Sequence, residues 1–174
     1  LLRIVRKHIL CLFGYWCFTT QFRAMENNLS LQNVISAVRT FHDSFKIPNS
    51  DEPNSSLSEK DVLLRHRLMA EENDEYLEAA KAGDMVEIAD ALGDQLYILC
   101  GTILSHGMQD VIEDVFSEIQ ASNMSKLGAD GLPILREDGK VLKGPSYFRP
   151  NIKAILMNSE SELKSVDAVD SNLI

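Results

Sequence analysis

The chain has 174 residues, of which 45% are hydrophobic, 25% charged and 7% aromatic, and its formal net charge is −9. This composition fits one globular domain with a core and excludes collagen-like, disulfide-dense and wholly disordered proteins. The negative charge argues against binding to nucleic acid or to a membrane surface, because both are anionic. We therefore expect neither as a partner.

The first 24 residues differ from the rest of the chain. They hold two of the three cysteines, the sole tryptophan and four basic residues, with no acidic residue. Basic residues followed by an apolar run are typical of a signal peptide. However, the first methionine is Met25. We interpret residues 1–24 as an N-terminal extension that is either untranslated or a targeting peptide.

The remaining chain is interpreted as one domain over residues 25–156, followed by a flexible tail over 157–174. After residue 24 the sequence contains a single cysteine, Cys100. An internal disulfide is therefore excluded there, which favours a reducing compartment and a cytoplasmic location. Cys100 itself is expected to be a small core residue.

Capping residues and apolar spacing predict helices in the middle of the chain. Ser30 is a suitable N-cap for a helix that runs to about Phe45. Residues 47–57 are rich in helix breakers and are expected to form a loop. Ser58 begins a second helix, and Gly83 is expected to end it.

Two further helices follow. The pairs Asp84 with Glu87 and Asp110 with Glu113 are capping-box patterns that predict a helix start after each aspartate. The expected apolar stripe of the third helix is Ile88, Leu92, Leu96, Leu99 and Ile103, and that of the fourth is Ile112, Val115, Phe116 and Ile119.

After residue 130 the pattern changes. Residues 132–135 and 141–142 flank Asp138-Gly139, which predicts a small hairpin. The expected fold class is all-α, a four-helix bundle with a small C-terminal hairpin or loop extension.

Most of the negative charge lies in 24 consecutive residues. Segment 71–94 carries nine acidic residues and one basic residue, Lys81, for a net charge of −8. The short turn at Gly83 should place its two helices antiparallel. Counting from that turn, Glu75 and Asp90 lie at nearly the same height, as do Glu72 and Asp94, given the helical rise per residue.

These acids also share faces. Glu72 and Glu75 lie on one face of the second helix, and Glu87, Asp90 and Asp94 lie on one face of the third. Because they border the predicted core, they require either raised pKa values or bound cations. Oxygen-only ligands favour Mg²⁺, Mn²⁺ or Ca²⁺ over zinc. Of these we expect Mg²⁺, with Mn²⁺ as an alternative. Simpler readings also exist: Asp74 and Glu78 fit a solvated face, and Glu87 fits a helix cap.

At these positions the sequence resembles the all-α nucleoside triphosphate pyrophosphohydrolase superfamily, which includes MazG-like proteins, dimeric dUTPases and phosphoribosyl-ATP pyrophosphohydrolase. The family motifs Glu-Glu-x-x-Glu and Glu-x-x-Asp read here Glu71-Glu72-Asn73-Asp74-Glu75 and Glu87-Ile88-Ala89-Asp90. Stretches 122–127 and 139–145 look like the MazG-like branch labelled phosphoribosyl-ATP pyrophosphohydrolase-like. The resemblance covers about residues 30–156.

One departure leaves the metal ligands open. If the second motif is aligned by its Asp-x-x-aromatic ending, its aspartate is Asp94 and its glutamate falls on Ala91. Glu87 with Asp90 restores the motif one turn earlier. The assignment among Glu87, Asp90 and Asp94 therefore stays open.

The resemblance implies a Mg²⁺-dependent enzyme that cleaves a nucleotide between its α- and β-phosphates to give a monophosphate and pyrophosphate. Phosphoribosyl-ATP is an alternative substrate, and a non-catalytic helical interaction module is the alternative outside enzymes. Implied metal ligands are Glu72, Glu75, Glu87, Asp90 and Asp94.

Other roles implied by the resemblance concern water, substrate and assembly. Glu71 or Glu72 would position or deprotonate the attacking water. Asn123, Lys126 and Lys143 would bind the substrate if their segment folds back over the site, whereas Lys140 beside the hairpin turn is read as solvated. Family relatives also imply a homodimer or a higher homo-oligomer.

Overall fold

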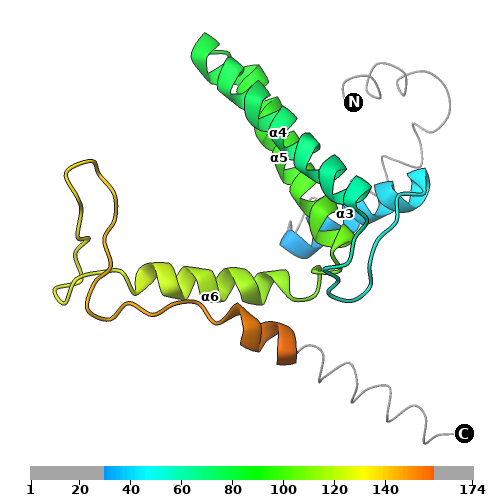
Figure 1. The fold of residues 1–174 in the computed structure, drawn as a ribbon. Helices are drawn as coiled ribbons and strands as arrows, with labels where there is room; N and C mark the ends of the chain where they lie inside the picture. Colours follow the sequence, from blue (N-terminus) through cyan, green and yellow to red (C-terminus); the bar gives the residue numbers. More distant parts are fainter. Residues whose placement is uncertain (1–29, 159–174) are drawn as a thin grey trace, which may run out of the picture.

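The computed structural model describes residues 30–158. Its four long helices are α3 (Leu31–Phe45), α4 (Glu59–Ala82), α5 (Met85–Ser105) and α6 (Ile112–Met124). Residues 152–158 form a further helical segment, which continues two residues past the domain end expected at 156. The all-α prediction is confirmed (Figure 1). The expected extension over 1–24 and nearly all of the expected tail lie outside the described residues.

Helices α4 and α5 form the predicted antiparallel hairpin, because its start and turn are set locally. The Ser58 side chain accepts a hydrogen bond from the amide of Asp61, and α4 ends at Gly83 with φ +69°. Asp84 then caps α5 by accepting from the amides of Val86 and Glu87. These contacts satisfy helix-end groups that have no partner within the helix, and they confirm the expected helix boundaries.

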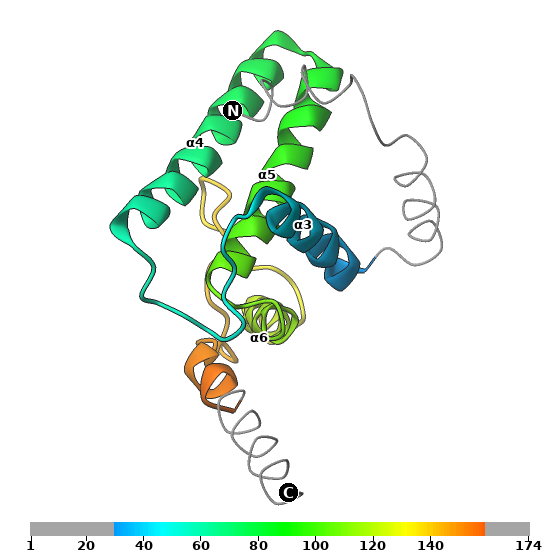
Figure 2. The same ribbon diagram turned by 90° about the vertical axis from the view of Figure 1, so that its right-hand side faces the viewer.

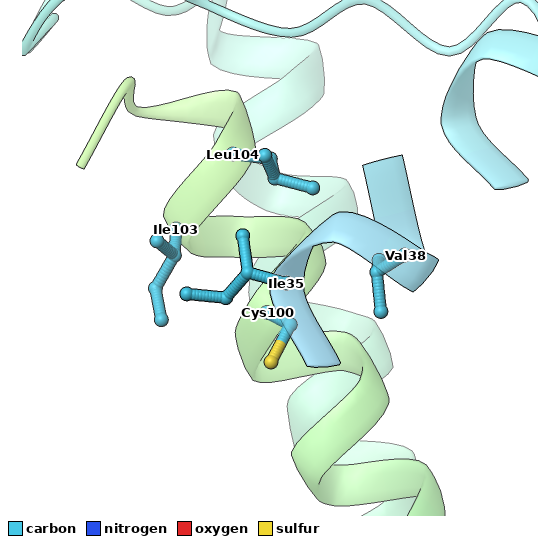
Figure 3. Close-up of a cluster of buried hydrophobic side chains, with 5 residues drawn as sticks. All are labelled: Ile35, Val38, Cys100, Ile103 and Leu104. Carbon is cyan, nitrogen blue, oxygen red and sulfur yellow. The ribbon is translucent and has the colours of Figure 1, made fainter. Parts of the chain in front are cut away.

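The buried core lies where α3 crosses the C-terminal half of α5 (Figure 2). Ile35 and Val38 of α3 pack against Cys100, Ile103 and Leu104 of α5 (Figure 3). Cys100 is fully buried, as expected for a small core residue. This core anchors α3 beside the lower part of the hairpin and leaves the turn end of the hairpin extended.

The loop that connects α3 to α4 is tied to the end of α5. The amide of Ser50 donates to the carbonyl of Leu104 at 2.9 Å, and the amide of Asn54 donates to that of His106 at 2.8 Å. Gly107 has φ +65°, and a Cβ built there would lie 1.9 Å from the carbonyl oxygen of Glu52. The loop therefore requires glycine at this position.

Helix α6 departs from the predicted pattern in two ways. Its N-cap is Val111 and no side chain caps it, so the expected capping role of Asp110 is wrong. The helix then runs away from the α4–α5 hairpin (Figure 1), which leaves Phe116 65% and Ile119 40% exposed. The helix start is instead held by backbone hydrogen bonds, including the Ile112 amide to the Met108 carbonyl at 3.0 Å.

The segment after α6 turns back along that helix. Ser122 Oγ donates to the Phe148 carbonyl at 2.8 Å, and the Asn151 amide donates to Glu118 Oε1 at 2.8 Å. The predicted hairpin is confirmed as a small one, with a single bridge between Leu135 and Val141. Within residues 30–158, no helix is long and apolar enough to cross a membrane.

Candidate active site

The predicted acids gather along the α4–α5 hairpin, with Glu72 at their centre. Glu72 is 6% exposed, although it lies on a helix that is mostly solvated. Of the buried side-chain oxygens in the described part of the chain, its Oε2 is one of two without a hydrogen-bond partner. A buried carboxylate oxygen without a donor is costly, so this atom requires a proton or a cation.

The charges around Glu72 come from both helices. Burial is the largest cause that raises the pKa of Glu72, and together with the neighbouring carboxylates of Asp94, Glu75, Glu71 and Asp90, in that order, it raises this pKa to about 7. We call these five residues the carboxylate cluster. Asp94 also contributes to the raised pKa of Tyr97, about 12, although burial is the larger cause there. The pairing of Glu72 with Asp94 across the hairpin agrees with the predicted register.

Gln95, for which the sequence motifs predict no role, stabilises this register. Gln95 Nε2 donates to the backbone carbonyl of Glu72 at 3.2 Å and joins α5 to α4 beside the cluster. Glu75, Asp90 and Asp94 are half-buried, whereas Glu71 is exposed. Glu87 is also exposed, and its amide is part of the α5 cap.

The carboxylates are near one another but do not converge on one point. Across residues 30–158, no three His, Cys, Asp or Glu side chains are grouped closely enough to hold a metal ion. Mutual repulsion between neighbouring carboxylates favours such separated side chains. The hairpin thus presents the oxygen ligands on two adjacent helices, and a cation would have to draw them together.

The predicted substrate-binding residues lie elsewhere in this chain. Lys126 Nζ donates to Asn123 Oδ1 at 2.7 Å at the far end of α6. Lys143 Nζ lies 4.2 Å from the ring centroid of Tyr147 in the segment after α6. Figure 1 shows this segment at the far end of α6 from the α4–α5 hairpin. The structure therefore brings Asn123 and Lys126 together, but it does not bring them or Lys143 to the carboxylate cluster.

Gly144 follows Lys143 in the segment after α6. A Cβ built at Gly144 would lie 2.0 Å from the carbonyl oxygen of Leu127. The space beside Gly144 is thus taken by the chain's own backbone, which fastens the segment to the end of α6. Lys140 is exposed next to the hairpin turn, in agreement with its solvated interpretation.

Comparison with known proteins supports the predicted family resemblance. The model of the phosphoribosyl-ATP pyrophosphohydrolase family matches residues 38–123, which include all the predicted acidic ligands. The predicted family resemblance is confirmed. This pyrophosphohydrolase match supports a nucleotide pyrophosphohydrolase as the general class of enzyme. It ends at Asn123 and does not include Lys126 or Lys143.

Structure and curated-sequence comparisons add the following. A crystal structure from Exiguobacterium sp. 255-15, provisionally assigned as an NTP pyrophosphohydrolase, is 26% identical with a TM-score of 0.44. The match covers 75% of this chain and 97% of that one. No curated protein matches the chain at a significant level.

Proposed function

We propose that the protein hydrolyses the α–β phosphoanhydride of a nucleoside or deoxynucleoside triphosphate in a Mg²⁺-dependent reaction, giving a monophosphate and pyrophosphate. The observation that carries this proposal is the buried Glu72 carboxyl, with its unpaired Oε2 among four other carboxylates. Its pKa of about 7 suits proton exchange at neutral pH. The family match supports the same class of reaction.

The ligand chemistry of the cluster fits a hard divalent cation. The five residues of the cluster all offer carboxylate oxygens, which are the ligand type of Mg²⁺ and Mn²⁺. Glu72, Glu75, Asp90 and Asp94 would hold the ion, with Glu87 nearby on α5. Once bound, the ion would offset phosphate charge and acidify water.

The protein's own carboxylates supply the remaining chemistry. Glu71 precedes Glu72 and is exposed, so its carboxyl group is accessible to a water molecule that it would orient. The ionised form of Glu72 is the alternative proton acceptor. Its raised pKa makes this carboxylate a stronger base than an ordinary glutamate. Either residue would hold water for in-line attack on phosphorus.

Pyrophosphate release tests the proposal directly. The full chain is incubated with each of the common NTPs and dNTPs and with modified nucleotides, with Mg²⁺ or with excess chelator. We expect release with at least one nucleotide in Mg²⁺ and none in chelator. Glu78→Gln, an exposed α4 substitution outside the cluster, should retain activity, whereas Glu72→Gln should lose it. Absence of turnover with every nucleotide would contradict the proposal.

Phosphoribosyl-ATP is the second candidate substrate, and the matching family model favours it. The same reaction type applies, because the cleaved bond is again an α–β phosphoanhydride. Turnover of phosphoribosyl-ATP alone, with none of the dNTPs, would select this alternative.

A non-catalytic helical interaction module is the third candidate. The observation in its favour is that the carboxylates of the described region do not converge. This alternative predicts that Mg²⁺ leaves the melting temperature unchanged and that no nucleotide is cleaved.

We also propose that the protein assembles as a homodimer or a higher homo-oligomer. Leu92, Leu96 and Leu99 were expected in the core, but they are 49%, 45% and 47% exposed. They lie at helical spacing on α5, the helix that carries Asp90 and Asp94. An apolar stripe of this kind is typical of a surface that packs against another protein.

A further inference from the structure

A second polar cluster lies at the junction of α3, α4 and α5. Gly101 is buried in α5, with His42 of α3 and Arg65 of α4 beside it. A Cβ built at Gly101 would lie 2.9 Å from His42 Nε2 and 3.0 Å from Arg65 Nη1. The missing side chain of Gly101 therefore leaves room for both polar groups beside α5.

The Arg65 guanidinium carries hydrogen-bond donors that are not used within the described residues. Arg65 is half-buried, and within residues 30–158 its guanidinium forms no ion pair and no hydrogen bond. Burial lowers the pKa of Arg65, and the more distant charge of Asp61 opposes this. A guanidinium presents five N–H donors in a planar fork, so a half-buried one favours a ligand that supplies acceptors.

His42 supports this arrangement without adding charge. Its Nδ1 lies 2.6 Å from Asn49 Oδ1, and because an amide oxygen only accepts, Nδ1 carries the proton. Burial is the main cause that lowers the pKa of His42, and Arg65 adds to it. A neutral His42 can therefore lie beside Arg65 and hold the junction together.

Aromatic rings lie between this junction and the carboxylate cluster. Tyr97 is about one turn from Asp94 in one direction and from Gly101 in the other. Its ring meets that of Phe41 edge-on, with 5.6 Å between centroids, and Phe41 in turn lies 4.4 Å from the ring of Phe45. Phe45 is 52% exposed, so an aromatic surface remains open to a ligand.

The order along the hairpin is carboxylates, aromatic rings and then guanidinium. Arg65 is seven residues from Glu72, and Gly101 is seven from Asp94, a rise of about 10 Å on each helix. Arg65 is therefore too far from the carboxylate cluster to contact a phosphate beside the cleaved bond. The separation matches the distance from that bond to the far edge of the nucleobase. The rings between them offer a surface on which a base can stack.

We infer that this junction binds the nucleobase: the base packs on Phe41 and Phe45, and Arg65 donates to acceptor atoms on its edge. The inference rests on the proposed function and adds the residues that select the base. Substrates of this site are therefore nucleotides whose base presents an acceptor edge, such as O6 and N7 of guanine or O2 and N3 of cytosine.

The test compares Arg65→Met with Arg65→Lys, and uses Arg67→Met as the matched control, an exposed arginine of the same helix. Each variant is assayed with the full nucleotide panel, and inhibition by inorganic pyrophosphate is measured in parallel. For Arg65→Met we expect kcat/KM for the preferred nucleotide to fall about ten- to a hundredfold. Poor substrates and pyrophosphate inhibition should change less than about threefold.

Further readouts separate base binding from other roles. Arg65→Lys should recover part of the lost selectivity, and Phe45→Leu should raise KM without changing kcat. A uniform loss for all nucleotides together with weaker pyrophosphate inhibition would place Arg65 on a phosphate and overturn the inference. Unchanged selectivity in an active enzyme would overturn the inference alone, whereas an inactive wild type would overturn the proposed function as well. Comparing melting temperatures identifies any variant that fails to fold, and then Arg65→Gln replaces it.

Discussion

At the scale of single residues, the proposed chemistry centres on one buried carboxyl. Glu72 combines near-complete burial, an unpaired oxygen and four neighbouring negative groups. Such a residue destabilises the fold whenever it is charged without a counter-ion.

The raised pKa of Glu72 predicts how stability depends on pH. The folded-state pKa is about 7, above the ordinary value of 4.5, so the folded state binds the proton more tightly than the unfolded state. Without metal, stability should therefore fall as pH rises from 4.5 to 7, and the full cost is present above 7. Glu72→Gln should be more stable than wild type at pH 8 by roughly 1–3 kcal/mol and nearly equal at pH 4.5.

Urea unfolding in chelator at both pH values measures this difference. Glu78→Gln serves as the control, because Glu78 is exposed on the same helix and should give little change at either pH. A Glu72→Gln variant that is less stable than wild type at pH 8 would contradict a buried, repelled carboxylate.

Divalent cations should reverse this cost. Mg²⁺ that binds the folded cluster and not the unfolded chain stabilises the fold in proportion to the logarithm of its concentration. We expect the melting temperature to rise with Mg²⁺ for wild type and Glu78→Gln. The rise should be absent for Glu72→Gln and for Asp94→Asn. Equal shifts in all four proteins would indicate a cation site elsewhere.

At the scale of secondary-structure elements, glycines set the boundaries of the helices for two distinct reasons. Gly83 ends α4 with φ +69°, and a Cβ there would meet nothing within 4 Å. Gly107 has a similar φ, but a Cβ there would collide with the backbone of Glu52. The first position needs only the left-handed conformation, whereas the second also needs the space.

The two alanine variants should therefore differ. Gly83→Ala should cost about 1 kcal/mol, because only the left-handed conformation is penalised. Gly107→Ala should cost roughly 2–5 kcal/mol, since the overlap with Glu52 must also be relieved. Denaturant unfolding measures the loss of stability in both variants. Equal losses would show that the loop between α3 and α4 shifts at no energetic cost to relieve the overlap.

Local patterns accounted for most of the elements. Ser30, Ser58, Gly83 and Asp84 form their caps through neighbours within five residues, so their roles could be predicted from the sequence. The pairing of Glu72 with Asp94 followed from counting helical rise on either side of a short turn. The predicted capping role of Asp110 was wrong because the turn that precedes α6 places Val111, and not Asp110, at the N-cap position.

Long-range arrangement could not be predicted in the same way. Periodicity gives an apolar stripe on α5 but does not say whether another helix of the same chain covers it, and Leu96 remains exposed. Arg65 lies seven residues before Glu72, a spacing that already places both on one helix face. Its contact with Gly101 and His42 depends on how three helices cross, and no local signal contains that information.

At the scale of the whole molecule, uncovered apolar side chains predict self-association. The α5 stripe of Leu92, Leu96 and Leu99 is exposed, as is Phe116 on α6. Leu96→Glu should shift the protein towards monomer in sedimentation measurements, because a charge in an apolar interface must be desolvated. Leu132→Glu, an exposed leucine outside the helices, is the control and should leave the mass unchanged. A monomeric wild type would contradict the proposed assembly.

Because the pKa of Glu72 is about 7, this carboxyl group binds a proton in weakly acidic solution. A cation that occupies the cluster must displace the proton that Glu72 holds below pH 7, so binding and proton release are coupled. Heats of Mg²⁺ binding at pH 6.5 should therefore vary with the ionisation enthalpy of the buffer, and this dependence should vanish at pH 8.5. If Mg²⁺ binds at the cluster as proposed, its affinity should therefore fall as the medium becomes weakly acidic.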